Sequence, residues 1–321
     1  MGFVAFVAAV ILLLLLVSGG YVFFAACIRS KELSWLVEEQ ISKTPFAQHY
    51  EKIVAADRWL KSHDAQDVYI KAYDGLKLHA LWIPAEKPRG TVLLAHGYRS
   101  CMLVDFGLAF DFYHNHGMNL LIPDQRAHGK SQGKFITFGV KESKDMQLWI
   151  DFHNAHFGKF PVMLSGLSMG ASTMLYLADK ELPENVKGIV ADCGFTSPKD
   201  ILSSVFTNVT HLPAQPTLWI TDLFARFFAG FSLYECDSRK ILPKSKIPVL
   251  MIHGTDDNFV PCNMTTEAYA ACTGPKELLL VEGAEHGVSF LVDRRSYTQT
   301  VIAFMDKILG DRYELRNDQE L

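Results

Sequence analysis

The sequence predicts an α/β protein with a mostly parallel sheet, and three observations lead to this fold class. Short apolar runs typical of buried strands alternate with segments of helical spacing from residue 91 onwards, as parallel strands alternate with their covering helices. Asp74-Gly75 separates two alternating runs, residues 67–73 and 76–83, which predicts an antiparallel hairpin at the start of the sheet. A chain of 321 residues, 49% of them hydrophobic, can bury one large core.

The expected elements follow in chain order. After the hairpin, strands are predicted at residues 91–95 and 119–122, in the apolar run that begins at Phe160, and at residues 186–192, 248–253 and 277–281. Helices are predicted at residues 102–115, at 140–156, from the end of the Phe160 run to about 179, from about 263, and at 290–309. This makes eight strands with helices on both faces.

Residues 199–245 interrupt the alternation and predict a short helical cap. Two or three short helices are expected there, above the carboxyl ends of the strands. Most of the cap's aromatic residues should fill its own core, while a few, with Trp219, Phe227 and Phe228 as the candidates, should line an apolar pocket.

Residues 1–28 predict a membrane anchor. No charge occurs from Gly2 to Ile28, and a helix of that length would be roughly 40 Å long, more than the ~30 Å of a bilayer's hydrocarbon core. A cleaved signal peptide is the alternative, but the basic start is missing and the apolar stretch is too long; residues 24–27 only faintly resemble a lipoprotein cleavage box. An uncleaved anchor is therefore expected, and a domain without residues 1–28 is expected to stay active.

The remaining boundaries and the orientation follow from composition. Residues 29–66 are interpreted as a helical connector with Trp35 near the membrane interface, residues 67–309 as the α/β domain and residues 310–321 as a polar tail. Lys and Arg follow the apolar span and none precedes it, which predicts a catalytic domain on the cytoplasmic side. The six cysteines show no paired spacing, as in a reducing compartment. A net charge of -4 argues against nucleic acid as a partner, and the oligomeric state is left open.

Ser168 is the candidate nucleophile. An apolar run ends in Gly166-Leu167-Ser168-Met169-Gly170, and a helical segment follows, which predicts a sharp strand-to-helix turn with the serine hydroxyl held clear. The two glycines remove side chains that would collide as the chain reverses. The pattern by itself is short, so the hypothesis depends on an acid and a base elsewhere.

Both partners occur in the expected order. Asp256 and Asp257 follow the strand at residues 248–253, and His286 lies in the loop after the next strand. Serine, then acid, then histidine is the order used when a Gly-x-Ser-x-Gly elbow is part of a triad.

These motifs together resemble the α/β-hydrolase superfamily over about residues 67–309. His96-Gly97, Asp124-x-Arg126-x-His128-Gly129-x-Ser131, the elbow, His253-Gly254-x-x-Asp257-x-x-Val260-Pro261 and His286-Gly287 all occur in order. Within the superfamily the chain is similar to membrane-anchored hydrolases of the Bem46 and serine aminopeptidase or monoacylglycerol lipase-like groups.

The resemblance implies a role for each matching residue. Ser168 is the nucleophile, His286 the general base and Asp257 the acid that orients it, with Asp256 as the alternative acid. The backbone amides of Tyr98 and Met169 form the oxyanion hole.

Other polar residues are assigned no chemistry. Asp124, Arg126 and His128 resemble the loop that braces the family's active site from below, rather than a catalytic group. The histidine pairs at 114 and 116 and at 153 and 156 lack a third metal ligand. No metal and no cofactor is expected.

The sequence therefore predicts a serine hydrolase acting on a small-molecule acyl substrate, with a carboxylic ester of small to medium acyl chain as the first choice because the cap is aromatic and short. Peptidase, aminopeptidase, thioesterase and acyltransferase activities use the same triad and stay open. A non-catalytic, membrane-tethered binding module is the alternative from another class.

Overall fold

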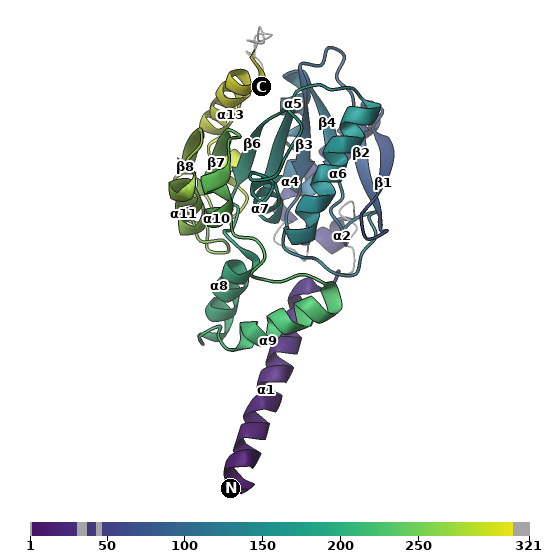
Figure 1. Ribbon diagram of the computed structural model, residues 1–321. Coiled ribbons are helices and arrows are strands. Elements are labelled where there is room, and N and C mark those ends of the chain that lie inside the picture. The colour runs from purple at the N-terminus through teal and green to yellow at the C-terminus, as the bar shows by residue number, and fades with distance from the viewer. Residues whose placement is uncertain (1, 31–36, 43–46, 311–321) are drawn as a thin grey trace.

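The computed structural model describes residues 2–30, 37–42 and 47–310, and shows one long helix projecting from an α/β domain (Figure 1). Trp35 and the tail beyond Gly310, both of which figure in the sequence interpretation, lie outside the described residues. The strands are β1 (Gln66–Lys71), β2 (Lys77–Ile83), β3 (Gly90–Ala95), β4 (Met118–Pro123), β5 (Val162–Leu167), β6 (Val186–Asp192), β7 (Val249–Gly254) and β8 (Lys276–Val281).

All eight strands form one sheet in the order β1-β2-β4-β3-β5-β6-β7-β8. The first two pairings are antiparallel and the others are parallel, which confirms the predicted mostly parallel sheet with an antiparallel start. The chain reverses direction along the sheet at β3, so the loops after β3 and β5 meet at the same edge. This is where an open α/β sheet presents its binding crevice.

Helices cover both faces of the sheet and close two hydrophobic cores. One face packs on α6 (Val140–His156) and α7 (Met169–Leu175), with Trp149 and Tyr176 fully buried. The other packs on α3 (Tyr50–Ser62), α4 (Met102–Phe106), α5 (Phe110–Asn115) and α13 (Arg294–Leu309). Central strands such as β3 and β4 are buried along their whole length, because both of their faces lie under helices.

Three helices of the structure differ in their bounds from those predicted from the sequence. The helix expected at residues 102–115 is two helices, interrupted at Gly107, where an added Cβ would come within 2.5 Å of the Ala56 side chain on α3. The last helix is preceded by a separate turn, α12 (Ser289–Val292), because Asp293 caps α13 by accepting a hydrogen bond from the amide of Ser296 (2.9 Å). α7 ends at Leu175 and continues only as turns.

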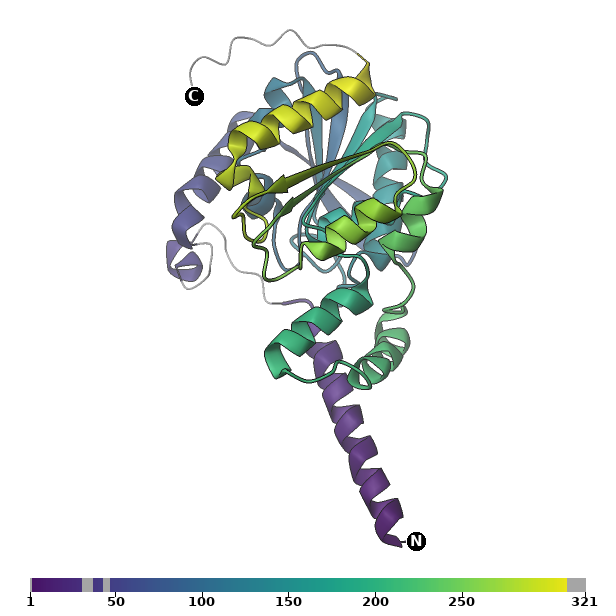
Figure 2. The ribbon, with the colours of Figure 1, turned by 90° about the vertical axis from the view of Figure 1, so that its left-hand side faces the viewer.

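The cap lies between β6 and β7, in the region expected from the sequence. It contains α8 (Pro198–Thr210), α9 (Thr217–Phe224), the π-helical turn η2 (Ala225–Ala229) and α10 (Ser238–Ile241). Ser197 begins α8 by accepting a hydrogen bond from the Asp200 amide, with Pro198 in the first turn. Figures 1 and 2 show α8 and α9 below the sheet, around the base of the projecting helix.

The projecting helix is α1 (Gly2–Cys27). Within the described residues it is the one helix long and apolar enough to cross a membrane. Its side chains are exposed over most of residues 2–17, but Gly19, Gly20, Phe23 and Cys27 are buried on one face. α1 therefore has an outer part clear of the domain and an inner part built into it.

Close approach to α9 fixes the inner part of α1. A Cβ on Gly19 would come within 2.5 Å of the Ile220 side chain, and one on Gly20 within 3.1 Å of the Phe224 ring. Beyond the helix, Ile28 forms a β-bridge with Phe135, and the amide of Ile136 donates to the carbonyl of Cys27 (2.7 Å). The sequence predicts the apolar span but not this docking, because composition does not reveal which turns of such a helix meet protein.

Candidate active site

Ser168 lies on the turn between β5 and α7 in a backbone conformation that is unusual for a residue with a side chain. Its φ is 55° and its ψ is −116°, and its amide donates to the carbonyl of Asp192 (2.8 Å) at the end of the neighbouring strand. Any Cβ on Gly166 would overlap the backbone of Gly170, and one on Gly170 would overlap the carbonyl of Ala95. The turn therefore requires both glycines, as the sequence motif predicts.

The structure brings Ser168, His286 and Asp257 into one hydrogen-bonded line. The Oγ of Ser168 is 2.9 Å from Nε2 of His286, and Nδ1 of the same ring is 2.7 Å from Oδ2 of Asp257. The three residues come from the loops after β5, β8 and β7, which meet at one edge of the sheet. A proton on Nδ1 pointing at the carboxylate leaves Nε2 free to accept the serine proton.

Asp257, rather than Asp256, contacts the histidine. Its second oxygen, Oδ1, accepts from the amides of Phe259 (2.9 Å) and Val260 (2.8 Å), which fixes the plane of the carboxylate. The exposed Asp256 instead accepts a hydrogen bond from the Thr255 hydroxyl (2.8 Å).

The same surroundings keep Asp257 ionised. Burial opposes its ionisation, but contacts from His253 and His286 outweigh burial and hold the pKa of this carboxyl well below its usual range. The Nε2 of His253 lies 3.2 Å from Oδ2 of Asp257. A carboxylate that stays charged keeps His286 in the tautomer described above.

Two backbone amides, those of Tyr98 and Met169, are the predicted oxyanion hole. Met169 is the first residue of α7, so its amide lies at the positive end of the helix. Tyr98 lies in the loop after β3, and that loop is held by Asp105 of α4. The half-buried carboxylate of Asp105 accepts from the amide of Gly97 (2.6 Å) and from the hydroxyl of Ser100 (2.6 Å).

The oxyanion loop is also bonded to α1. The Tyr98 hydroxyl donates to the carbonyl of Ala26 (2.8 Å), and the Arg99 guanidinium donates to the carbonyls of Ala25 (2.6 Å) and Ile28 (3.1 Å). Burial raises the pKa of Tyr98 to about 12, so its hydroxyl remains a donor. The expectation that residues 1–28 are separable from the site therefore does not match the contacts, since their end supports the loop that carries Tyr98.

Asp124, Arg126 and His128, in the loop after β4, are held by polar contacts with neighbouring elements. Arg126 forms a two-point contact with Asp145 (2.6 Å each), and Asp124 accepts from Nδ1 of His79 (2.7 Å). Burial lowers the pKa of His128 to about 3.

The neutral ring of His128 is committed to backbone groups at both nitrogens. Its Nδ1 donates to the carbonyl of Arg126 (2.9 Å), and its Nε2 accepts from the amide of Arg99 (3.0 Å). These bonds explain why His128, although it lies near the oxyanion loop, serves that loop's position and not proton transfer.

One group in the described part of the chain has three potential metal-ligand atoms close together: Cys193, Asp257 and His286, within 4.8 Å of one another. Two of these are the hydrogen-bonded acid and base already described. Burial raises the pKa of the Cys193 thiol well above its ordinary value, so the sulfur is protonated and a poor ligand. The donor set suits a proton-transfer pair better than a metal ion.

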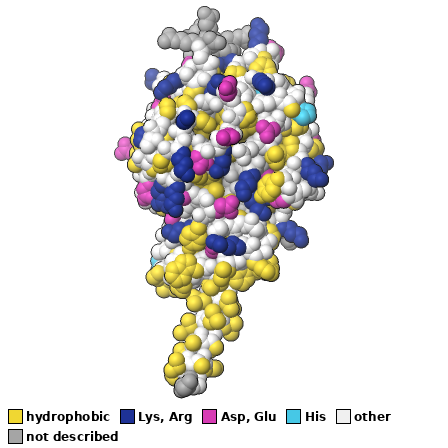
Figure 3. All heavy atoms as spheres, viewed as in Figure 1, with side chains coloured by type: hydrophobic (Ala, Val, Ile, Leu, Met, Phe, Trp, Pro, Cys, Tyr) yellow, Lys and Arg dark blue, Asp and Glu magenta, His cyan; other side chains and the backbone are white. Residues whose placement is uncertain are grey.

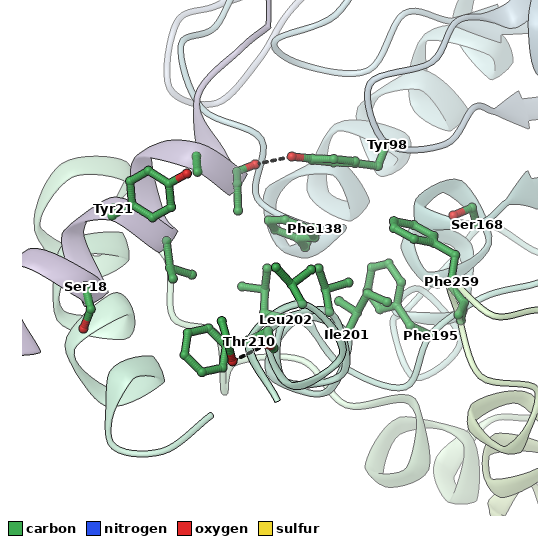
Figure 4. A pocket seen from close by; sticks show the side chains of 17 residues that line it. Ser18, Tyr21, Tyr98, Phe138, Ser168, Phe195, Ile201, Leu202, Thr210 and Phe259 are labelled. Carbon is green, nitrogen blue, oxygen red and sulfur yellow. Dashed lines mark hydrogen bonds between the residues drawn. The ribbon is translucent and has the colours of Figure 1, made fainter. Parts of the chain in front are cut away.

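Two cavities meet at Ser168. The first, about 510 Å³, is almost wholly apolar and lies between α1 and α8. Figure 4 shows its lining side chains extending from Ser168 and Phe259 at one end to Tyr21 and Ser18 of α1 at the other. The second, about 570 Å³, opens on the other side and has more polar walls, including Lys52, Asp105, Glu285 and His286.

The aromatic residues that line the apolar cavity are not the ones proposed from the sequence. Trp219, Phe227 and Phe228 are 59%, 81% and 46% exposed and lie outside its lining, which includes Tyr21, Tyr98, Phe138, Phe195, Phe206 and Phe259. The cap contributes mainly aliphatic side chains of α8, such as Ile201, Leu202 and Val205. Sequence analysis located the cap but could not tell its outward face from its inward one.

Sequence reasoning missed two supporting features of the site. Asp105 carries no motif signal, because a lone carboxylate in a helix is most simply interpreted as a solvated side chain. The involvement of Ala25 and Ala26 could not be found at all, because they contribute only backbone carbonyls and a small apolar surface.

Comparison with known proteins yields a consistent set of matches. Residues 86–219 match the family described as serine aminopeptidase, S33. The YqkD protein of Bacillus subtilis, uncharacterized, is 30% identical over 226 residues, which are 70% of this chain and 73% of that protein. Protein bem46 of Schizosaccharomyces pombe is 25% identical over 199 residues, 61% of this chain and 62% of that protein.

Solved structures agree in fold. The esterase Pf2001 of Pyrococcus furiosus superposes with a TM-score of 0.63 at 25% identity, over 78% of this chain and 94% of that chain. The acylaminoacyl peptidase of Pyrococcus horikoshii gives 0.56 at 16% identity, over 79% of this chain and 43% of that chain.

Proposed function

Because the chain belongs to the α/β-hydrolase superfamily, we propose that it is a membrane-anchored serine hydrolase that cleaves a carboxylic ester through Ser168, His286 and Asp257. The observation that carries the proposal is the line of hydrogen bonds from the serine Oγ to Nε2 of His286 and from Nδ1 to Asp257. A serine held on a strained turn next to a correctly oriented imidazole is an activated nucleophile.

In the first half of the reaction the Ser168 Oγ bonds to the ester carbonyl carbon. The serine proton moves to Nε2 of His286, and the carbonyl oxygen becomes an oxyanion that accepts hydrogen bonds from the amides of Tyr98 and Met169. As the oxyanion collapses, the bond to the alcohol oxygen breaks and Nε2 returns the proton to that oxygen. The alcohol leaves and an acyl-serine remains.

In the second half water replaces the alcohol. His286 Nε2 takes a proton from water while the water oxygen bonds to the acyl carbon, and the same two amides stabilise the second oxyanion. Collapse breaks the bond to Oγ, which regains its proton from His286. The products are the carboxylic acid and free Ser168. Every proton transfer in the two halves of the reaction is therefore accounted for by Ser168, His286 and water.

An ester is favoured over a peptide by the walls of the cavity that reaches Ser168. The cavity between α1 and α8 has hardly any polar surface with which to hold an extended peptide backbone. Pf2001 is described as an esterase and the Pyrococcus horikoshii protein as an acylaminoacyl peptidase, so both chemistries occur among structures of this fold. Peptidase, thioesterase and acyltransferase activities remain the alternatives to be tested on the same protein.

Anchoring is proposed from the way α1 joins the domain. Phe23 and Cys27 have no exposed surface, and the carbonyls of Ala25 and Ala26 accept hydrogen bonds from the oxyanion loop. A cleaved signal peptide would not be built into the mature fold in this way. The helix is therefore proposed to stay attached, with the catalytic domain on the cytoplasmic side, as the basic residues after the span indicate.

Labelling with a fluorophosphonate probe tests the proposal. The detergent-solubilised protein should be labelled, and Ser168→Ala should abolish labelling and lower kcat for a butyrate ester by about 10⁴-fold or more, with His286→Ala similar in kcat. The exposed residues Ser62 and His156 offer matched controls, since Ser62→Ala and His156→Ala should retain both probe labelling and esterase activity. A protein that is not labelled, or a Ser168→Ala variant that keeps its esterase activity, would support the tethered binding module instead.

A further inference from the structure

The apolar cavity has α1 as one of its walls. Ser18, Tyr21, Val22, Ala25 and Ala26 line it from α1, opposite the aliphatic side chains of α8. A helix that served only as a tether would need no contact with the candidate active site. Here the last turns of the apolar helix complete a chamber that ends at the candidate nucleophile (Figure 4).

The far end of this chamber lies at the level that a bilayer would reach. The part of α1 clear of the domain, residues 2–17, would be roughly 24 Å long at about 1.5 Å per residue, less than the ~30 Å hydrocarbon core. A bilayer spanned by α1 must therefore extend to about Gly19 and Tyr21, where α9 crosses. Tyr21 and Val209, each 74% exposed, line the chamber at this level and mark its mouth.

Exposed apolar side chains surround α1 at the same level. We call them the collar: Val209, Leu212, Trp219, Leu223, Phe227 and Phe228, which are 46% to 74% exposed apart from Phe227 at 81%. Figure 3 shows hydrophobic surface gathered where the projecting helix meets the domain. Exposed apolar surface of this extent next to an apolar helix is stable when lipid, not water, covers it.

The second cavity is more polar than the first, although most of its wall is still apolar. It meets the first at Ser168, Tyr98 and Phe259, and its walls carry Lys52 and Glu285. An ester bound across Ser168 would place one end in an almost wholly apolar chamber and the other in a cavity that offers polar and charged side chains. This division matches an amphiphile, with a hydrocarbon chain on one side of the carbonyl and a polar alcohol on the other.

We propose that α1 is part of the substrate-binding site, and that the acyl chain of a long-chain lipid ester passes from the bilayer through the mouth between α1 and α8 into the apolar chamber. The polar alcohol of the lipid then occupies the second cavity. This inference rests on the proposed function, because it assigns the substrate class of the same Ser168 site.

The test uses the full-length protein in phosphatidylcholine vesicles. Two esters of glycerol are compared, a hexadecanoyl ester dissolved in the bilayer and a butanoyl ester supplied from water. Val209→Trp narrows the mouth, and Ala25→Trp narrows the chamber one turn of α1 further in, both at exposed positions. Ala9→Trp adds the same side chain to a part of α1 remote from the chamber. Each methylene that loses its burial costs about fourfold in kcat/KM.

Val209→Trp and Ala25→Trp should each lower the ratio of long-chain to short-chain kcat/KM by about 10-fold or more, while Ala9→Trp leaves the ratio at the wild-type value. Equal ratios in all four proteins would overturn the inference. So would a wild-type enzyme that hydrolyses the bilayer ester no faster than the butanoyl ester.

A second measurement needs neither of the narrowing variants. A hexadecanoyl glycerol ester with a photoreactive group at the chain end, dissolved in the vesicles, should crosslink Ser168→Ala protein in the segments of α1 and α8 that line the chamber. Crosslinks confined to the outer part of α1, residues 2–17, would exclude the chamber as the site of the chain. Fluorophosphonate labelling of the wild type is run in parallel: loss of labelling refutes the serine hydrolase, whereas labelling without a chain-length effect refutes only the bilayer route.

Discussion

Replacing Asp257 with asparagine should disable the site without unfolding it, and the structure specifies why. Oδ1 of Asp257 accepts from the amides of Phe259 and Val260, whereas Oδ2 faces Nδ1 of His286. The asparagine oxygen must take the place of Oδ1, because both amides need an acceptor and that of Val260 is buried. Its NH₂ group then faces Nδ1, which can only accept, so the proton of the neutral ring moves to Nε2.

The magnitude follows from the cost of the opposite orientation. Turning the asparagine so that its oxygen faces Nδ1 would leave both amides without an acceptor, at about 1–3 kcal/mol each. A total of about 2–6 kcal/mol makes the competent tautomer rarer by about 30-fold to about 10⁴-fold. Loss of the carboxylate charge next to the developing imidazolium adds to this. We therefore expect kcat to fall by about 10³- to 10⁴-fold.

Steady-state hydrolysis of a butyrate ester in detergent measures the effect, with thermal unfolding as the check on folding. Asp256→Asn is the matched control, because that exposed carboxylate is bonded to Thr255 and should lose less than about twofold in kcat. If Asp257→Asn kept more than a tenth of wild-type activity, the tautomer argument would be wrong. If Asp256→Asn showed the large loss, the acid would have been assigned to the wrong neighbour.

The remaining predictions concern α1 and the elbow. Deleting residues 1–17 should leave the butyrate activity of the solubilised protein within about threefold of wild type. Deleting residues 1–28 should lower both the activity and the melting temperature, because Phe23 and the carbonyls bonded to Tyr98 and Arg99 are then lost. Equal melting curves for the two truncated proteins would contradict this prediction. Gly170→Ala should give little folded protein on expression, since its Cβ would overlap the Ala95 carbonyl, while Gly2→Ala, at the exposed start of α1 where an added Cβ meets nothing within 4 Å, should express normally. Recovery of well-folded Gly170→Ala protein would show that the turn can relax.

The sequence by itself determined the class of fold, the positions of its strands along the chain and the residues that meet at the site. These features are encoded locally: buried strands need continuous apolar runs, the sharp turn at Ser168 needs Gly166 and Gly170, and each candidate partner follows a strand end. Carboxyl ends of parallel strands gather at one edge, so residues far apart in the chain could be predicted to meet there.

Only the tertiary structure decided what surrounds the hydrogen-bonded residues Ser168, His286 and Asp257. Apolar composition predicts that apolar side chains of residues 1–28 and 199–245 are shielded from water. Lipid, a neighbouring helix or a bound substrate in a cavity can each provide this shielding, and the sequence pattern is the same in each case. In the structure, Phe23 is buried in protein, Phe227 is exposed in the collar, and Ala25 lines the chamber. The direction in which each helix turns its apolar face depends on packing between α1, α8 and α9, which no local signal encodes.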